Sequence, residues 1–429
     1  MRAQSTVFSI ASACGLVAAF PPFNIWPLAW IALSPLFVIY RRSSLKESLT
    51  ASLLAGVVFF GALLYWIAIF GYAPWILLTL FQTIFFIAFA FTAHWPFHSN
   101  SSWLRLLIAP ALWVSFEWLR SLGLFGFTWG DLPQSQTRFL PVLQILSVTG
   151  PWGLSFIMVM ANVAFAELWL IHGAPHQVWR RSVIQALSVA GIVAVIVVSG
   201  FMAIRRSDLP GKGIRVAVIQ GNLDQELRPT ETWLEHTERT ISGYLDLTSA
   251  ALKHSPDLVV WPETAIPGYL TKSDPPRWLV ESLAGSGSAY FLVGASHQSV
   301  DSSGKSREHN GAFLFGPDGK LAGSYYKVHL VPFGEIVVGR RWLPFLDRYK
   351  IRDFDYSPGP GYYPIKARFG NVGVMICFES IFSYIPRLMT NRGANVLVVM
   401  TNDAWFKRTA AAEQHYVMSI LRAVENRRY

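Results

Sequence analysis

Charged residues are scarce in this chain, and cysteine is nearly absent. Only 14% of the 429 residues are Asp, Glu, Lys or Arg, whereas soluble domains carry about 25%. The two cysteines, Cys14 and Cys377, lie far apart, and Cys14 falls within an apolar run, so a disulfide framework is not expected. The histidines show no His-Glu-x-x-His spacing, and a P-loop is also lacking. We therefore expect no metal and no other cofactor.

Apolar residues dominate the first half of the chain. Hydrophobic residues make up 52% of the sequence, and a chain of this length is expected to form at least two units. Segments of membrane-spanning length are predicted at 5–21, 25–40, 51–72, 75–94, 103–120, 140–171 and 183–203. The first segment is expected to be retained, because Phe20-Pro21-Pro22 lacks the small residues of a signal-peptide cleavage site. The sequence therefore predicts a transmembrane helical domain at residues 1–206 with about seven spans.

The basic residues predict the orientation of these spans. The residues expected on the N-terminal side are Arg2, Arg41, Arg42, Lys46, Arg105, Arg180 and Arg181, against Arg120 and Arg138 on the other side. The positive-inside rule then places the N-terminus in the cytoplasm, and seven spans place the second half outside the membrane. The net charge is +10, but the sequence contains no basic stripe interleaved with aromatic residues. No nucleic-acid partner is therefore expected.

Two features of the membrane half have alternative interpretations. Glu117 and Arg120 are one helical turn apart, which favours a mutually satisfied ion pair over a contact to a lipid headgroup. The Gly- and aromatic-rich segment 123–131 that follows is typical of a membrane interface and could face a lipid substrate.

The second half, residues 207–429, alternates strands with helices, which predicts an α/β layered domain. Strands are expected at 214–220, 258–261, 290–294, 311–315, 321–329, 362–369, 372–377 and 396–401. Helices are expected near 230–253, 275–284, 382–391 and 409–427.

Three of these strands end in groups that can carry out nucleophilic catalysis. Glu263 follows one strand, Lys327 lies in a second, and Cys377 ends a third, where strand alternation would place Cys377 and Glu379 on one face. A thiol needs a base and benefits from a nearby cation, so Glu263 could take its proton while Lys327 stabilises the thiolate. Each residue alone also fits a structural role: a buried inert cysteine, a turn carboxylate and a lysine guarding a sheet edge.

Together these residues resemble the nitrilase superfamily, which carries a Glu-Lys-Cys triad on an α-β-β-α sandwich. The matching segments are Trp261-Pro-Glu263-Thr, Tyr326-Lys327-Val-His-Leu-Val-Pro-Phe-Gly-Glu335 and Ile376-Cys377-Phe-Glu379, with Gln220-Gly-Asn222, Asn402-Asp-Ala-Trp405 and Gln414-His415 also fitting. The resemblance implies that Glu263 is the base, Lys327 the oxyanion stabiliser and Cys377 the nucleophile. Glu335, Glu379 and Phe378 would support them.

A domain of this kind after a bundle of apolar helices resembles the apolipoprotein N-acyltransferases of the bacterial inner membrane. Trp129-Gly-Asp131-Leu is also similar to that branch. The resemblance implies a multi-pass inner-membrane enzyme with its catalytic domain on the periplasmic side. A phospholipid would donate an acyl group to Cys377 as a thioester, and the α-amine of an S-diacylglyceryl-cysteine apolipoprotein would accept it.

The chain departs from this family in three places. Phe378 replaces a common tyrosine, and the expected aromatic lid residue is missing from Gln225-Glu-Leu-Arg228, with Trp233 arriving later. The chain also ends at Tyr429 within a helical pattern, whereas the family has further strands and a final span, so we expect an incomplete sandwich.

The sequence leaves three other functions open. A membrane-tethered amidase or nitrilase acting on a small substrate would need the same triad, although seven spans exceed what a tether requires. An inactive lipid- or lipoprotein-binding homologue would not need all three triad residues. A transporter is not indicated, because the sequence shows neither repeated halves nor paired broken helices.

Overall fold

The computed structural model describes residues 3–171, 175–206, 213–222, 231–270, 275–300, 302, 304–339 and 355–429. The chain forms two compact units. A helical unit contains residues 1–208 together with 408–427, and an α/β unit contains 209–407 with 428–429. The expected domain boundary at 206–207 and the expected lid segment 225–228 involve residues outside those described.

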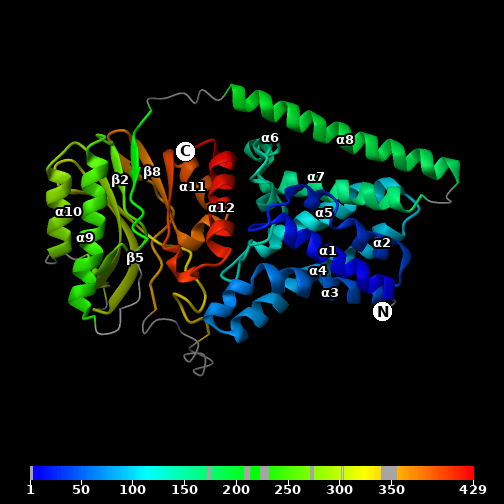
Figure 1. Ribbon diagram of the computed structural model, residues 1–429, viewed down its shortest axis with the longest axis horizontal. Coiled ribbons are helices and arrows are strands. Elements are labelled where there is room, and N and C mark those ends of the chain that lie inside the picture. The colour runs from blue at the N-terminus through cyan, green and yellow to red at the C-terminus, as the bar shows by residue number, and fades with distance from the viewer. Residues whose placement is uncertain are drawn as a thin grey trace. The chain divides into compact units, whose positions relative to one another are not determined.

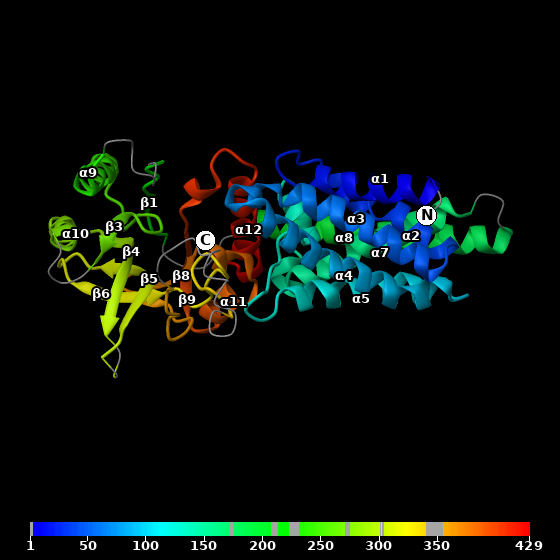
Figure 2. The same ribbon diagram turned by 90° about the horizontal axis from the view of Figure 1, so that it is seen from below.

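Six long helices build most of the helical unit, and in Figure 2 several of them lie side by side with similar axes. They are α1 (Ala3–Ala19), α3 (Leu45–Leu63), α4 (Tyr72–His98), α5 (Ser102–Arg120), α7 (Leu146–Trp169) and α8 (His176–Arg205). Ser44 and Ser101 cap α3 and α5 by accepting hydrogen bonds from the backbone N–H three residues ahead. Among the described helices, α3, α4, α7 and α8 are long and apolar enough to cross a membrane.

The second expected span, residues 25–40, does not form a single helix. The chain forms a short 3₁₀ helix, η1 (Trp26–Trp30), and then a nine-residue helix, α2 (Ser34–Arg42). Both begin with a proline in their first turn, Pro27 and Pro35. Proline is favoured at a helix start but cannot continue a preceding helix, so it divides the segment. The sixth expected span, residues 140–171, is likewise divided into α6 (Leu140–Leu143) and α7, and a short 3₁₀ helix, η3 (Leu132–Gln136), precedes it.

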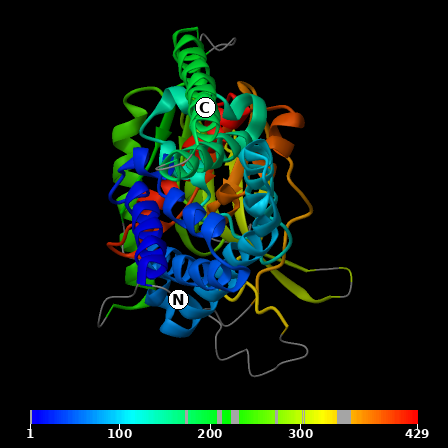
Figure 3. The ribbon, with the colours of Figure 1, turned by 90° about the vertical axis from the view of Figure 1, so that its right-hand side faces the viewer.

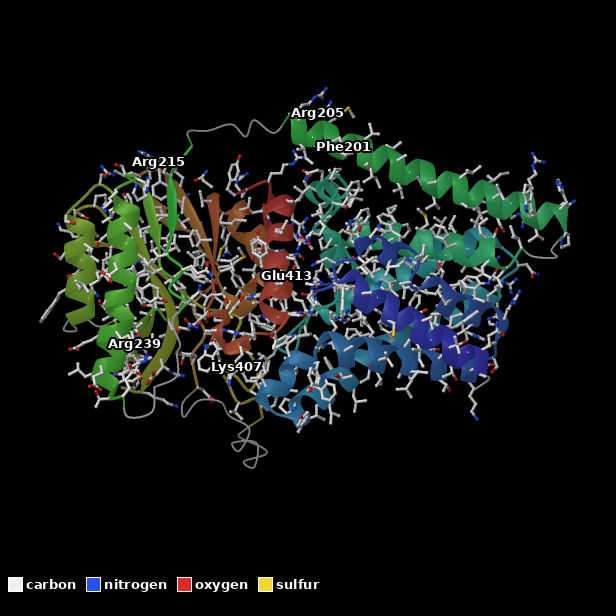
Figure 4. The ribbon with its side chains drawn as sticks, in the orientation of Figure 1. Phe201, Arg205, Arg215, Arg239, Lys407 and Glu413 are labelled. Carbon is white, nitrogen blue, oxygen red and sulfur yellow. The ribbon has the colours of Figure 1, made fainter. Side chains whose placement is uncertain are left out.

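Helix α8 is the least buried of the four helices that are apolar enough to cross a membrane. Only 11% of its most apolar window is buried, and Figure 3 shows α8 at the edge of the bundle. Figure 4 shows the side chains of Phe201 and Arg205 near its C-terminal end, where an exposed aromatic residue precedes the basic residues that end the apolar stretch. This order is typical of a helix that reaches a membrane interface.

Arg120 holds a buried loop rather than pairing with Glu117. Its Nη1 lies 3.1 Å from Asp131 Oδ1, and its Nη2 donates to the Trp129 carbonyl at 2.7 Å. Its Nε donates to Gln82 Oε1 at 2.7 Å. The expected Glu117–Arg120 ion pair is therefore wrong, because the loop from residue 126 to 137 is buried and its polar groups need partners.

Helix α12 (Ala411–Asn426), which follows the α/β unit in the sequence, packs into the helical unit. Gln414 Oε1 accepts a hydrogen bond from Trp129 Nε1 at 2.7 Å, and its Nε2 donates to the Pro21 carbonyl at 3.0 Å. Glu413, labelled in Figure 4, pairs with Arg138 at 3.0 Å. A hydrophobic periodicity cannot reveal which unit a helix joins, so the sequence did not predict this placement.

The α/β unit contains two sheets. In the first, the order is β1-β2-β4-β5-β6, with β3 also pairing with β4. Its strands are β1 (Val216–Val218), β2 (Leu258–Val260), β3 (Ile266–Tyr269), β4 (Tyr290–Val300), β5 (Ser306–Phe315) and β6 (Leu321–Tyr326). The second sheet has the order β7-β8-β9, with β7 (Ile365–Ala367), β8 (Gly370–Ile376) and β9 (Ala394–Met400).

Helices cover the outer faces of the two sheets, as Figure 1 shows. Helices α9 (Trp233–Leu252) and α10 (Pro275–Gly285) lie beside the first sheet, and α11 (Tyr384–Asn391) packs on the second. The sheets meet through β6 with β7 and β5 with β8. The core between α9, α10 and the first sheet includes Tyr244, which stacks on Trp261 with ring centroids 5.1 Å apart. The α-β-β-α sandwich expected from the sequence is confirmed.

Each strand and helix predicted in this half is present, and their ends differ by a few residues. Strand β3 was missed, because four residues containing Pro267 and Gly268 carry little strand signal. The helix expected near 409–427 ends at Asn426, where Arg427 adopts a left-handed conformation with φ 48°. The Leu397 N–H then donates to the Tyr429 carbonyl at 2.8 Å.

Candidate active site

Strands from both sheets end at one group of polar side chains. Glu263 follows β2, Lys327 follows β6, and Cys377 follows β8. The turn after β2 can pass close to β4 only because residue 294 is glycine: a Cβ there would lie 2.2 Å from the Pro262 carbonyl oxygen. This close passage fixes the backbone that carries Glu263.

Lys327 lies between two carboxylates. Its Nζ is 2.9 Å from Glu335 Oε2, 3.0 Å from Glu335 Oε1 and 3.7 Å from Glu263 Oε1, and the whole residue is 1% exposed. Burial alone would lower the pKa of the ammonium, but the two carboxylates outweigh burial and raise its pKa above the ordinary value. Lys327 is therefore charged across the physiological pH range.

Asn310 joins the same two carboxylates. Its Nδ2 donates to Glu263 Oε1 at 2.8 Å and to Glu335 Oε1 at 3.1 Å. Its backbone carbonyl also accepts the Lys327 N–H at 2.9 Å, where β5 runs antiparallel to β6. The second oxygen of Glu263 accepts the Asn402 N–H at 3.1 Å from the segment after β9. Glu263 is thus held by residues from both sheets.

Glu379 is a buried carboxylate that accepts hydrogen bonds from several segments. Its carboxylate is fully buried and accepts hydrogen bonds from the Tyr325 hydroxyl at 2.8 Å and from the Val328, His329 and Ile376 N–H groups at 2.9–3.1 Å. Burial raises the pKa of Glu379, while these backbone donors act in the opposite direction. The carboxylate ties the end of β6 to the end of β8, which carry Lys327 and Cys377.

Cys377 does not continue β8. Its φ of 52° lies in the left-handed region, and residues Cys377–Ile381 form a 3₁₀ turn, η5. The strand alternation expected to place Cys377 and Glu379 on one face is therefore wrong, because the strand ends at Ile376. Positive φ at a cysteine is a strained conformation that must be held by its surroundings, and such residues cluster at functional sites.

The Cys377 thiol is protonated at rest. Burial raises its pKa well above the ordinary value, the negative charge of Glu263 raises it further, and the Lys327 ammonium acts in the opposite direction. The thiol therefore attacks most readily while a base removes its proton, and Glu263, whose charge acts on the thiol, can serve as that base.

Phe378 takes part through packing. Its ring centroid lies 5.8 Å from that of His329 and 5.4 Å from that of Phe382. His329 Nδ1 in turn lies 3.1 Å from the Tyr384 hydroxyl oxygen. Asn310, Tyr325 and Asn402 were not predicted from the sequence to belong to this group. Asn310 sits in a strand without any motif, and only the pairing of β5 with β6 brings it beside Lys327.

We predict that replacing Glu379 with alanine destabilises the α/β unit. Four donors, two of them fully buried, would lose their acceptor, which should lower the free energy of unfolding by about 3 kcal/mol or more. Tyr325→Phe removes only one of these hydrogen bonds and should cost about 1 kcal/mol. Thermal unfolding of both variants in detergent measures the difference. Equal, small shifts would contradict this role for Glu379.

We also predict that the resting thiol reacts slowly. In a Cys14→Ser background, iodoacetamide should alkylate Cys377 at pH 7 more than tenfold more slowly than it alkylates free cysteine, since a raised pKa leaves less thiolate. The alkylation rate, followed by intact mass, should keep rising beyond pH 9. A plateau below pH 8 would mean that the thiol is already ionised at rest.

Comparisons with known proteins agree with this geometry. Residues 215–429, which carry Glu263, Lys327 and Cys377, match the family described as carbon-nitrogen hydrolase. Residues 12–164 match the apolipoprotein N-acyltransferase N-terminal domain.

Full-length relatives are similar over almost the whole chain. An apolipoprotein N-acyltransferase of Geobacter metallireducens is 34% identical over 98% of this chain and 82% of its own length. Apolipoprotein N-acyltransferase 1 of Treponema denticola is 29% identical over 93% of this chain and 78% of its own, and that of Gloeobacter violaceus is 30% identical over 97% and 80%. This chain belongs to the apolipoprotein N-acyltransferase family.

Proposed function

We propose that this protein transfers a fatty acyl group from a phospholipid to the N-terminal α-amine of an S-diacylglyceryl-cysteine apolipoprotein. Family membership supports the reaction, and the observation that carries it is the contact of Glu263, Lys327 and Glu335 beside the Cys377 thiol. The reaction needs two acyl-transfer steps through one nucleophile, and this group supplies a nucleophile, a base and a fixed cation.

In the first step, Cys377 attacks the ester carbonyl carbon of the phospholipid. Glu263 takes the thiol proton as the sulfur–carbon bond forms, and it returns the proton to the oxygen of the departing lysophospholipid as the carbon–oxygen bond breaks. A thioester on Cys377 remains. Asn310 and the Asn402 N–H hold Glu263 in place for both proton transfers.

In the second step, the α-amine of the apolipoprotein attacks the thioester carbon. Glu263 takes a proton from the nitrogen, the carbon–sulfur bond breaks, and the proton passes to the Cys377 sulfur, which regenerates the thiol. Lys327 stabilises negative charge on the sulfur and on the carbonyl oxygen in both steps, as a preorganised cation in a site with little water. Glu335 keeps Lys327 charged and fixed.

The helical unit supplies the path for the acyl chain. At about 0.8 kcal/mol per methylene, moving a chain of roughly 15 carbons into water would cost on the order of 12 kcal/mol. The apolar outer surfaces of helices such as α4 and α8 let the donor approach within the bilayer instead. Excluding water also protects the thioester from hydrolysis.

We propose that the α/β unit lies on the periplasmic side of the inner membrane. Arg41 and Arg42 end α2, Arg105 lies in the first turn of α5, and Arg180 and Arg181 lie near the start of α8. If α3, α4, α5, α7 and α8 cross in alternation, all of these basic residues share one face, which is cytoplasmic by the positive-inside rule. Arg205, at the end of α8, then reaches the opposite face.

A transfer assay tests the proposed function. The purified protein would be incubated with phospholipid vesicles and a synthetic peptide that begins with S-diacylglyceryl-cysteine. We expect a peptide product heavier by one fatty acyl group and joined by an amide, which hydroxylamine does not cleave. An enzyme that hydrolyses small amides but leaves this peptide unchanged would instead be a membrane-tethered amidase.

A further inference from the structure

We propose that Asn310 binds the acceptor amine: its side-chain oxygen, Oδ1, accepts a hydrogen bond from the attacking α-amine during the second transfer. This inference rests on the proposed function and adds a binding group for the acceptor. In the candidate active site, the side-chain nitrogen of Asn310 makes two hydrogen bonds, whereas its side-chain oxygen makes none within the described part of the chain.

Asn310 is 2% exposed, so its polar atoms cannot rely on bulk water. Its Nδ2 makes the two hydrogen bonds to Glu263 and Glu335 described above. Its Oδ1 is buried and has no hydrogen-bond partner within the described part of the chain. A buried acceptor left unpaired costs about 1–3 kcal/mol, which is acceptable where a substrate supplies the missing donor.

The orientation of the amide follows from its neighbours. Both contact atoms are carboxylate oxygens, which can only accept while the carboxylates are ionised, so the NH₂ group must face them. Turning the amide over would place its oxygen against Glu263 and Glu335 and leave the NH₂ group unpaired. The geometry therefore presents an acceptor, not a donor, beside the proposed base.

This arrangement suits an amine better than an alcohol. A primary amine carries a lone pair and two N–H groups: the lone pair can face the thioester carbon, one N–H can give its proton to Glu263 as the carbon–nitrogen bond forms, and the second can donate to Asn310 Oδ1. An alcohol has one hydrogen, which Glu263 must take, so nothing remains for Oδ1. Asn310 thus favours transfer to the amine over return of the acyl group to a lysophospholipid.

A competition experiment on one acyl-enzyme isolates this effect. Protein acylated by phospholipid would be mixed with the S-diacylglyceryl-cysteine peptide and a deuterium-labelled lysophosphatidylcholine at the same time. Mass spectrometry would then give the ratio of amide product to ester product. In Asn310→Ala, both transfers slow because Glu263 loses a hydrogen bond. The ratio should also fall about tenfold or more, because only the amine loses a bond to Oδ1.

Two further variants complete the test. Tyr325→Phe disturbs the hydrogen bonds of Glu379 without touching Asn310, and its product ratio should equal that of the unmodified protein. Asn310→Ser keeps a small hydroxyl and serves if the alanine variant forms too little acyl-enzyme; its ratio should also fall. An unchanged ratio in either Asn310 variant overturns the proposal, whereas absence of any acyl-enzyme in the unmodified protein overturns the proposed function instead.

Discussion

Replacing Lys327 with methionine is expected to lower kcat for acyl transfer by about 10³-fold. Methionine keeps the approximate length of the side chain but removes the charge that faces Glu335, Glu263 and Cys377. Removing one preorganised donor from an oxyanion site typically costs about 10²–10³ in kcat. The thiol pKa should rise as well, because the positive charge of Lys327, which lowers it, is lost.

The same substitution should also destabilise the fold. Glu335 and Glu263 would be left buried without their cation, and breaking a buried ion pair in this way typically costs about 3–5 kcal/mol. Lys320→Met is a matched control, because Lys320 is exposed in the turn before β6 and should change neither property. Steady-state transfer rates and thermal unfolding measure both effects. A Lys327→Met variant with near-normal kcat would contradict the role of Lys327.

Replacing Glu263 with glutamine should separate the ionisation of the thiol from catalysis. Without the carboxylate, acyl transfer should slow by about 10²–10⁴-fold, since the general base is removed. Alkylation of Cys377 by iodoacetamide should nevertheless become faster at pH 7, because the negative charge of Glu263 raises the thiol pKa. Because unfolding would also expose the thiol and speed its alkylation, thermal unfolding of Glu263→Gln must first show that the variant is folded.

Measuring both rates on one preparation of Glu263→Gln tests this directly, with Asp318→Asn as an exposed carboxylate control. If alkylation slows along with transfer, Glu263 does not control the thiol. If transfer is unchanged, another group is the base.

The sequence predicted the α/β unit well because strand and helix periodicity there is local. The strands that end at Glu263, Lys327 and Cys377 were placed within a few residues. Motif resemblance, rather than periodicity, brought these three residues into one group. Their distances could not follow from the sequence, because they depend on how two separate sheets meet.

Three features of the structure were not predicted correctly from the sequence, each for a physical reason. Proline at residues 27 and 35 divided an apolar segment that by composition alone could have spanned a membrane. Arg120 paired with Asp131, eleven residues away, rather than with its helical neighbour Glu117, because a buried loop supplied several acceptors at once. Asn310 carries no motif and was missed, since strand pairing alone places it beside the carboxylates.

The proposed reaction requires that Cys377 carries the acyl group as a thioester. The most direct measurement is an intact-mass spectrum of the purified protein after incubation with phospholipid vesicles, beside a Cys377→Ala variant. We predict a gain of one fatty acyl mass that hydroxylamine removes and that the alanine variant lacks. A protein that transfers acyl groups to the peptide without this adduct, or an adduct that persists in Cys377→Ala, would show that Cys377 is not the nucleophile.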